Sequence, residues 1–190
     1  SSIAGTTYYY CVVTDPCGSS SSNISGAVIV TSPPNAGVLS GSQDICVNGL
    51  TSLSTNGTTG GTWSSSTSSV ATVTNSGSVT GIASGTATIT YTLNGLGGCA
   101  NATATRTVNV NPLPTAAIEN VTATSVITCD TTTIQVVASG GISYSWSNGT
   151  TVVGTSAALD IVSGGTYIVT VTNEFGCVAS SSITITENKH

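Results

Sequence analysis

The stretch that decides the fold is residues 86–93, Thr-Ala-Thr-Ile-Thr-Tyr-Thr-Leu, in which polar and apolar side chains alternate without interruption. A second stretch, residues 166–172, places Tyr167, Val169 and Val171 on one face in the same way. A period of two with one polar face is typical of antiparallel strands that lie half buried in a sheet. Both stretches therefore predict strands of a β-sandwich.

The composition favours the same fold class along the whole chain. Only 5% of the 190 residues are charged, against roughly 25% in typical soluble domains. Helix-favouring surface residues such as Lys and Glu are therefore scarce, while Val, Ile, Thr and Tyr, which suit a pleated surface, are common. We predict an all-β protein.

The charge and the hydropathy pattern exclude several classes of function. The formal net charge is −5, and Lys and Arg together number 2. Nucleic-acid binding and attachment to anionic membranes both need clustered basic residues, so we predict neither. No run of 18 or more apolar residues is present, so we expect no membrane insertion by this segment. The first five residues lack the basic flank and apolar core of a signal peptide, and we expect the segment to be internal to a longer precursor.

Landmark residues recur along the chain at a spacing of about 80 residues, a size suited to a small β-sandwich. We therefore predict tandem immunoglobulin-like β-sandwiches. Residues 1–32 would be the C-terminal strands of a truncated module, and residues 33–112 and 113–190 would be complete modules. The recurring landmarks are the linker prolines Pro34 and Pro114, the tryptophans Trp63 and Trp146, the early cysteines Cys46 and Cys129, and the late cysteines Cys17, Cys99 and Cys177.

Each complete module contains an early and a late cysteine, and we predict one disulfide in each, Cys46–Cys99 and Cys129–Cys177. No Cys-x-x-Cys motif is present and the single histidine, His190, is terminal, so zinc and redox sites are disfavoured. Closing loops of about 50 residues would stabilise each module by roughly 4 kcal/mol. Disulfides also indicate an oxidising, extracellular location.

The partners of Cys11 and Cys17 are open at this stage. Cys17 occupies the place of a late cysteine, so its partner is expected in front strands that precede the chain. Cys11 ends a Tyr-x-Cys sequence, the spacing found in strand F of immunoglobulin domains, which again points to a preceding partner. The alternative is a local Cys11–Cys17 bridge across a hairpin.

Four aromatic residues are predicted to lie in the cores of the modules. Trp146 shares a face with Tyr144 on a strand where an inward tryptophan packs on the disulfide. Trp63, Tyr91 and Tyr167 are assigned to the core with it. The alternative for the two tryptophans is an exposed platform on which a sugar stacks.

The sequence predicts no catalytic, metal-binding or cofactor-binding residues, and hence no enzyme. A general base or an activated nucleophile requires a positioned histidine, lysine or carboxylate pair, and the acids stand singly along the chain. Calcium needs several converging oxygen ligands. Asp44 and Glu119 lie near the predicted module junctions, where a junction ion is the alternative to an ordinary turn or cap residue.

The middle module resembles a known family, the bacterial Ig-like group 2 domain, which also occurs in the stalks of intimin and invasin. The resemblance covers most of residues 40–111. The third module, through residues 140–147 and 165–173, resembles Ig-like and PKD-like repeats of Bacteroidetes surface proteins, and residues 8–18 resemble the end of another such repeat. The segments of the middle module that carry the resemblance are 60–66, 69–73, 77–81 and 85–89.

This resemblance implies a function in adhesion at the bacterial cell surface. Members of these families are long secreted adhesins attached to the outer membrane; some are exported by type IX secretion and some serve gliding motility. The expected role is a structural stalk or filament segment whose partners are neighbouring Ig-like modules of the same chain, with surface polysaccharide or a host or abiotic surface as further candidates. One alternative is a module that binds glycan or protein through loops or an exposed sheet edge. Another, prompted by the partial first module, is a fibre subunit assembled by strand donation.

Overall fold

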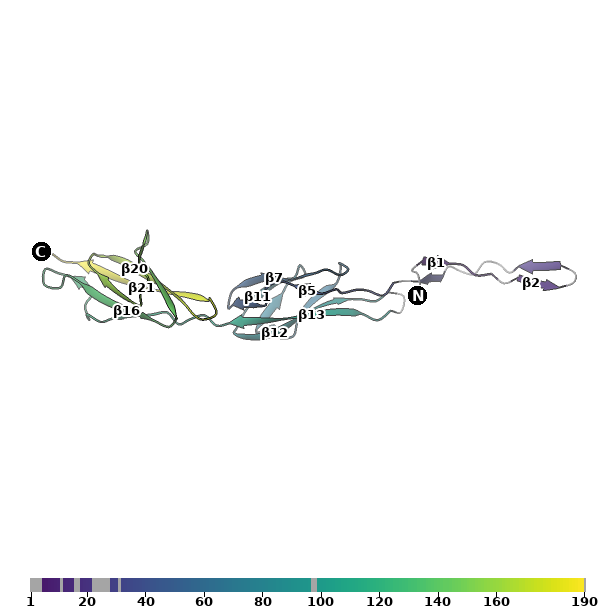
Figure 1. The fold of residues 1–190 in the computed structure, drawn as a ribbon, viewed down its shortest axis with the longest axis horizontal. Coiled ribbons are helices and arrows are strands. Elements are labelled where there is room, and N and C mark those ends of the chain that lie inside the picture. The colour runs from purple at the N-terminus through teal and green to yellow at the C-terminus, as the bar shows by residue number, and fades with distance from the viewer. Residues whose placement is uncertain are drawn as a thin grey trace. The chain divides into compact units, whose positions relative to one another are not determined.

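All the regular structure in the described part of the protein is β-strand, which confirms the all-β prediction. This part contains no helix long and apolar enough to cross a membrane. Figure 1 shows the strands along the ribbon. The computed structural model describes residues 5–10, 12–15, 18–21, 28–30, 32–96 and 99–189.

The chain divides into two compact units. Each is described below by itself. Unit 1 comprises Ser1–Gln43, Thr51–Val79 and Ala87–Val108, and unit 2 comprises Asp44–Leu50, Thr80–Thr86 and Asn109–His190.

The first strands form two short antiparallel ribbons. Strand β1 (Gly5–Thr7) pairs with β4 (Val28–Val30), and β2 (Val12–Asp15) pairs with β3 (Gly18–Ser21). Cys11 and Cys17 lie outside the described residues, so the hypotheses about their partners stay predictions, as does the partial module at residues 1–32.

Residues 39–111 form three sheets that follow the predicted alternation. The stretch that opened the sequence analysis lies in β12, where Ala87, Ile89, Tyr91 and Leu93 are buried and the threonines between them are not. The sheets have the strand orders β6-β13-β12-β9, β10-β11-β7 and β5-β8. Their strands are β5 (Leu39–Ser40), β6 (Asp44–Cys46), β7 (Leu50–Ser52), β8 (Ser54–Thr55), β9 (Thr62–Ser65), β10 (Ala71–Val73), β11 (Ser78–Gly81), β12 (Gly85–Leu93) and β13 (Ala102–Asn111).

One buried cluster of unit 1 lies beside an arginine that hydrogen-bonds to the chain at β5. Ala36, Leu39, Tyr91, Leu93 and Ala104 form a buried cluster. The guanidinium of Arg106 donates hydrogen bonds to the carbonyl oxygens of Leu39 at 3.0 Å and Gly41 at 2.6 Å. Hydrogen bonds from a charged donor are stronger than neutral ones, so Arg106 fastens the chain after β5 to β13.

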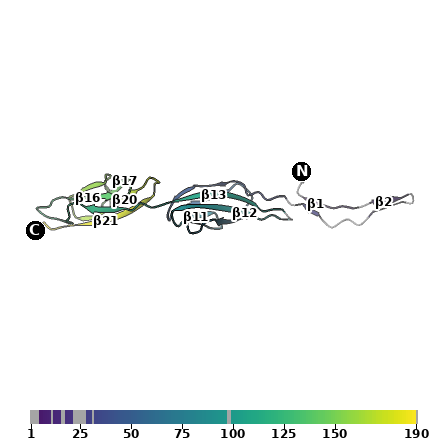
Figure 2. The ribbon, with the colours of Figure 1, turned by 90° about the horizontal axis from the view of Figure 1, so that it is seen from below.

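Residues 117–187 form a second sandwich of two sheets, with the strand orders β15-β21-β20-β17-β18 and β14-β16-β19. The long antiparallel pair β20 and β21 runs side by side in both views (Figure 1 and Figure 2). Its core includes Trp146, which is 0% exposed, and Tyr167. The strands are β14 (Ala117–Asn120), β15 (Val126–Ile127), β16 (Ile134–Ser139), β17 (Ser143–Ser147), β18 (Val152–Gly154), β19 (Ala158–Ile161), β20 (Gly165–Thr172) and β21 (Val178–Glu187).

An early, short strand pairs in parallel with the last long strand in each sandwich. In the first, Cys46 of β6 lies opposite Asn111 at the end of β13. In the second, Ile127 of β15 lies opposite Glu187 at the end of β21. Each early cysteine is therefore placed where the last strand of its own sandwich ends.

Candidate functional site

A disulfide bond lies inside unit 2. It joins Cys46, the last residue of β6, to Cys177, which directly precedes β21. The two Cα atoms are 5.7 Å apart, and the cysteines are separated by 131 positions in the sequence. The bond therefore links segments that the sequence analysis had assigned to different modules.

The predicted bond Cys46–Cys99 is wrong. Cys46 lies opposite Asn111, at the C-terminal end of β13, whereas Cys99 precedes the first residue of that strand. Ten residues of strand span roughly 30 Å, while the Cα atoms of a disulfide lie within about 7 Å of each other. Cys99 is half-buried.

The predicted bond Cys129–Cys177 is wrong for the same reason. Cys129 lies two residues beyond Ile127, which pairs with Glu187 at the far end of β21, while Cys177 lies at the near end. The length of this strand again separates the two thiols by roughly 30 Å. Cys129 is exposed, and Cys177 is bonded to Cys46.

A tight turn between β20 and β21 presents Cys177, and Asn173 organises it. The side-chain oxygen of Asn173 accepts hydrogen bonds from the backbone N–H groups of Phe175 at 3.1 Å and Cys177 at 3.0 Å. Gly176 has a φ of +78°, a conformation that glycine adopts without strain. The Asn173 amide donates to the carbonyl oxygen of Pro112 at 2.8 Å, so the same side chain also anchors the chain that follows β13.

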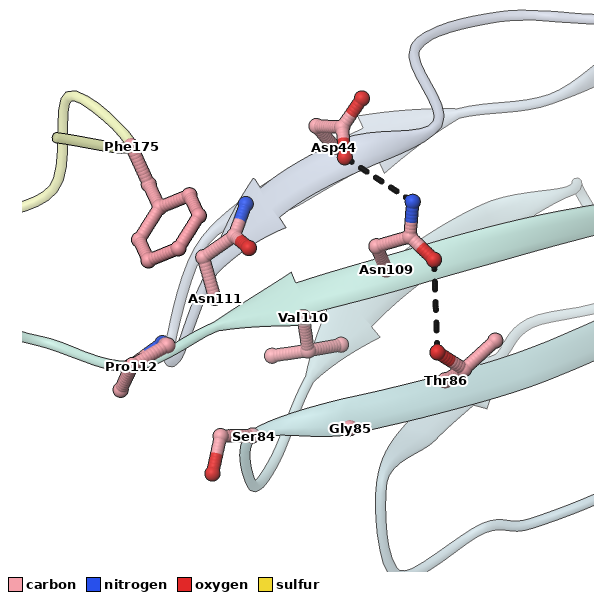
Figure 3. Close-up of a pocket in the computed structure, with 9 residues that line it drawn as sticks. All are labelled: Asp44, Ser84, Gly85, Thr86, Asn109, Val110, Asn111, Pro112 and Phe175. Atoms are coloured by element: carbon pink, nitrogen blue, oxygen red, sulfur yellow. Dashed lines mark hydrogen bonds between the residues drawn. The ribbon is translucent and has the colours of Figure 1, made fainter.

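An open cleft of about 620 Å³ lies beside this turn (Figure 3). On its wall the amide of Asn109 donates to the Asp44 carboxylate at 3.0 Å, and the Thr86 hydroxyl donates to the Asn109 side-chain oxygen at 3.3 Å. The ring of Phe175, which is 53% exposed, borders the cleft. The wall is thus a short ladder of side-chain hydrogen bonds across β6, β13 and β12.

The chemistry available to this cleft is limited. Among the residues that line it, Asp44 is the only ionisable side chain. The described residues contain no group of three or more His, Cys, Asp or Glu side chains that could hold a metal ion. Asp44 and Glu119 are not brought together in such a group in this part of the chain. The covalent chemistry that the structure shows beside the cleft is the Cys46–Cys177 bond.

The two tryptophans have different environments. Trp146 is enclosed, and its indole N–H donates to the carbonyl oxygen of Ser156 at 3.0 Å. Trp63 is half-buried; its ring centroid lies 4.8 Å from that of Tyr91, and it borders a second cleft of about 350 Å³. Tyr91 and Tyr167 are buried.

The sequence analysis assigned no role in a site to Asn173, Pro112 or Phe175. A signal for the turn is present, because Asn followed by Gly and Cys at the third and fourth positions suits a turn capped by an asparagine side chain. No such signal identifies which carbonyl oxygen the Asn173 amide binds, because that contact depends on the tertiary structure.

Residues 28–105 match the family described as Bacterial Ig-like domain (group 2). This segment includes β12 and Trp63, which belong to the stretches that resemble the family. The match covers less than half of the 190 residues and does not include the other sandwich, so the likeness to this family is a property of residues 28–105. A comparison with curated proteins finds no match.

Several solved structures match the chain at low similarity. The S-layer protein rSbsC(31-844) is 16% identical, with a TM-score of 0.37, over 98% of this chain and 35% of its own length. The N-terminal eight Ig domains of Down Syndrome Cell Adhesion Molecule isoform 1.30.30 are 16% identical, with a TM-score of 0.37, over 97% and 31%. The fibronectin(III)-like modules of Clostridium thermocellum CbhA are 10% identical, with a TM-score of 0.38, over 78% and 94%. The chain spans about a third of the first two, and no conclusion about function depends on these likenesses.

Proposed function

We propose that the chain is a load-bearing stalk segment of an extracellular bacterial cell-surface adhesin, in which the Cys46–Cys177 disulfide transmits tension. The proposed modules are residues 33–112 and 113–190, with residues 1–32 as the C-terminal strands of a truncated Ig-like module. The observation that supports the proposal is the bond itself, because it joins the group 2 Ig-like domain covalently to the sandwich that follows.

The disulfide changes the path of the load. When the chain is pulled at its ends, tension passes along the backbone to Cys46, crosses the bond and leaves along β21. The two cysteines are 131 positions apart in the sequence, and the 130 residues between them are then shielded from extension. Fully extended they would add roughly 450 Å of length. The stalk therefore keeps its length even if either core opens.

The disulfide bond and the low content of charged residues support an extracellular location. Disulfides persist in oxidising compartments and are rare in the cytosol. The surface is also nearly free of charged groups, at 5% of all residues, so few of its contacts depend on ion pairs that salt would screen. Both properties suit a structural element exposed to a changing medium.

Single-molecule pulling of the full chain tests the proposal. The chain is held at both termini and stretched before and after addition of a thiol reductant. We expect reduction to add a length gain of roughly 450 Å, because it releases the shielded residues. The oxidised chain should return to its starting length after each pull.

Other outcomes would count against the proposal. Bonds within each module would instead give two gains of roughly 170 Å each on reduction. A chain whose oxidised and reduced forms extend to the same length would not carry load through the bond. A Cys129→Ser variant is the matched control, since its thiol lies outside the disulfide and its loss should leave the pulling curve unchanged.

A second candidate function, binding of a neutral sugar ring by unit 1, is favoured by the cleft at Trp63. The lining combines a half-buried indole with Thr59, Asn75 and Ser76, and it includes no charged side chain. Its volume of about 350 Å³ lies at the lower end of small-molecule sites. A polar rim around an aromatic ring suits a ligand with one apolar face and several hydroxyl groups.

Nuclear magnetic resonance separates this candidate from the stalk. The two indole N–H signals are followed while methyl glucoside, methyl mannoside or N-acetylglucosamine is added to millimolar concentration. Binding predicts a shift of the Trp63 signal, identified by its absence in a Trp63→Phe variant, with the Trp146 signal unchanged. No shift with any of these sugars would leave the stalk as the only function proposed.

A further inference from the structure

We propose that Cys129 is the attachment point for a further Ig-like module, through a disulfide of the same kind as Cys46–Cys177. The partner is a cysteine that directly precedes the last strand of that module. This inference rests on the proposed stalk and extends it, because it makes the cross-link a repeating device.

The two early cysteines occupy equivalent places in their sandwiches. Cys46 follows Ile45, which is 8% exposed and pairs in parallel with Val110 near the end of the last strand. Cys129 lies two residues after Ile127, which is 1% exposed and pairs in parallel with Glu187 near the end of its last strand. Cys46 lies directly opposite the last residue of β13, and Cys129 lies two residues beyond the residue opposite the last residue of β21, so the two positions agree to within two residues. One of them is already bonded to a module that follows.

Cys129 lies in a hydrogen-bonded turn. The Thr128 hydroxyl oxygen accepts hydrogen bonds from the backbone N–H groups of Asp130 at 3.3 Å and Thr131 at 3.0 Å. The backbone N–H of Thr128 donates to the carbonyl oxygen of Thr131 at 2.9 Å. This closed turn carries the exposed thiol at its tip. A fixed turn reduces the ordering that a partner must impose on binding.

No cysteine within its own sandwich can form a disulfide bond with Cys129. Cys177 lies at the other end of β21, roughly 30 Å away, and its sulfur is bonded to Cys46. The equivalent contact at the other sandwich shows what the partner must offer. By analogy with Cys177, the partner cysteine would lie in a turn that is capped by an asparagine side chain, as Asn173 caps its turn. The amide of that asparagine would donate to the backbone carbonyl oxygen of Asn188, which follows β21 as Pro112 follows β13.

The covalent step is an ordinary thiol oxidation. The two thiols lose two protons and two electrons as the S–S bond forms, and oxidised glutathione accepts them to give two molecules of reduced glutathione. The step therefore needs only a disulfide oxidant, of the kind found where secreted proteins fold.

The test uses the full chain extended after His190 by a second copy of residues 113–190. The extended protein is refolded with oxidised and reduced glutathione, alkylated, and mapped by mass spectrometry. We expect near-complete loss of alkylation at Cys129 and a cross-linked peptide that joins it to the cysteine of the added copy equivalent to Cys177. In a Cys129→Ser variant of the extended protein, that added cysteine should be alkylated instead.

The outcomes separate this inference from the function on which it rests. If Cys46–Cys177 forms while Cys129 stays fully alkylated, or bonds to Cys99, the inference is wrong and the stalk stands. If Cys46–Cys177 itself is absent, both fail. A Cys177→Ser variant of the extended protein gives a further check, because Cys129 should still find the added cysteine.

Discussion

The side chain of Trp146 in unit 2 is fully buried, whereas the side chain of Trp63 in unit 1 is only half-buried. The difference lies in the neighbouring strands. Trp146 is on β17, which is flanked by β20 on one side and β18 on the other, where Gly154 lies opposite the indole. Trp63 is on β9, which in the described part of the chain is the last strand of its sheet and has only β12 beside it, with Tyr91 opposite.

This comparison shows that a repeated sequence position does not guarantee a repeated environment. The two tryptophans recur at the spacing of the repeat, but a flanking strand decides whether the ring is covered. Unit 2 also contains the disulfide. We therefore expect the stability of unit 2 to exceed that of unit 1 and to depend on a covalent bond. The described part of unit 1 is held by side-chain packing and by hydrogen bonds such as those of Arg106.

The largest effect should come from removing the disulfide. A Cys46→Ser variant loses the constraint on a loop closed over 131 positions, which on the chain-entropy estimate is worth about 5 kcal/mol. Urea unfolding followed by circular dichroism measures the change. The exposed Cys129→Ser variant is the control and should change the free energy of unfolding little. Equal effects of the two variants would remove the distinction between the units.

The next effect should separate the two tryptophans. Trp146→Ala removes a fully buried side chain and should cost about 3–5 kcal/mol. Trp63→Ala removes a half-buried ring and should cost about half as much, because less apolar surface is exposed by unfolding. Native-state hydrogen exchange of amides in β20 and β12 reports each region separately. A larger loss for Trp63 than for Trp146 would contradict the assignment of β9 as the open edge.

The smallest effect concerns an acid at the end of β21. The backbone N–H of Gly164 donates to the Glu187 carboxylate at 2.6 Å, and this bond, followed by the Lys189 ammonium at 3.0 Å, holds the pKa of Glu187 below its ordinary value. A lowered pKa in the folded state contributes stability above the unfolded pKa, and this contribution is lost as the pH falls through the folded value. The effect should be slight because both side chains are partly exposed.

Titration of the Glu187 side-chain carboxyl by nuclear magnetic resonance checks this prediction. Its midpoint should lie below the usual range for glutamate. A Glu187→Gln variant should lose a small part of the pH dependence of unfolding in acid, whereas Glu174→Gln, at an exposed position in a turn, serves as the matched control. A midpoint at or above the usual range would contradict the contact with Gly164.

The sequence was sufficient for the strands but not for the bonds between them. The alternation in residues 86–93 is a local property, so it predicts β12 directly. The pairing of Cys46 is not local. Equal spacing of the cysteines shows that they repeat, but it does not show that β6 runs parallel to β13 and so places Cys46 at the opposite end of the module from Cys99. That placement decides the partner.

A tryptic digest tests the central claim most directly, because Arg106 and Lys189 are the only Arg and Lys residues in the sequence. The oxidised protein is alkylated, unfolded in urea and cleaved without reduction. A bond between Cys46 and Cys177 predicts that fragments 1–106 and 107–189 stay joined and separate only on reduction, and that the same digest of Cys46→Ser releases them. Bonds Cys46–Cys99 and Cys129–Cys177 would each lie within one fragment, so separation of the two fragments without reductant would contradict the account.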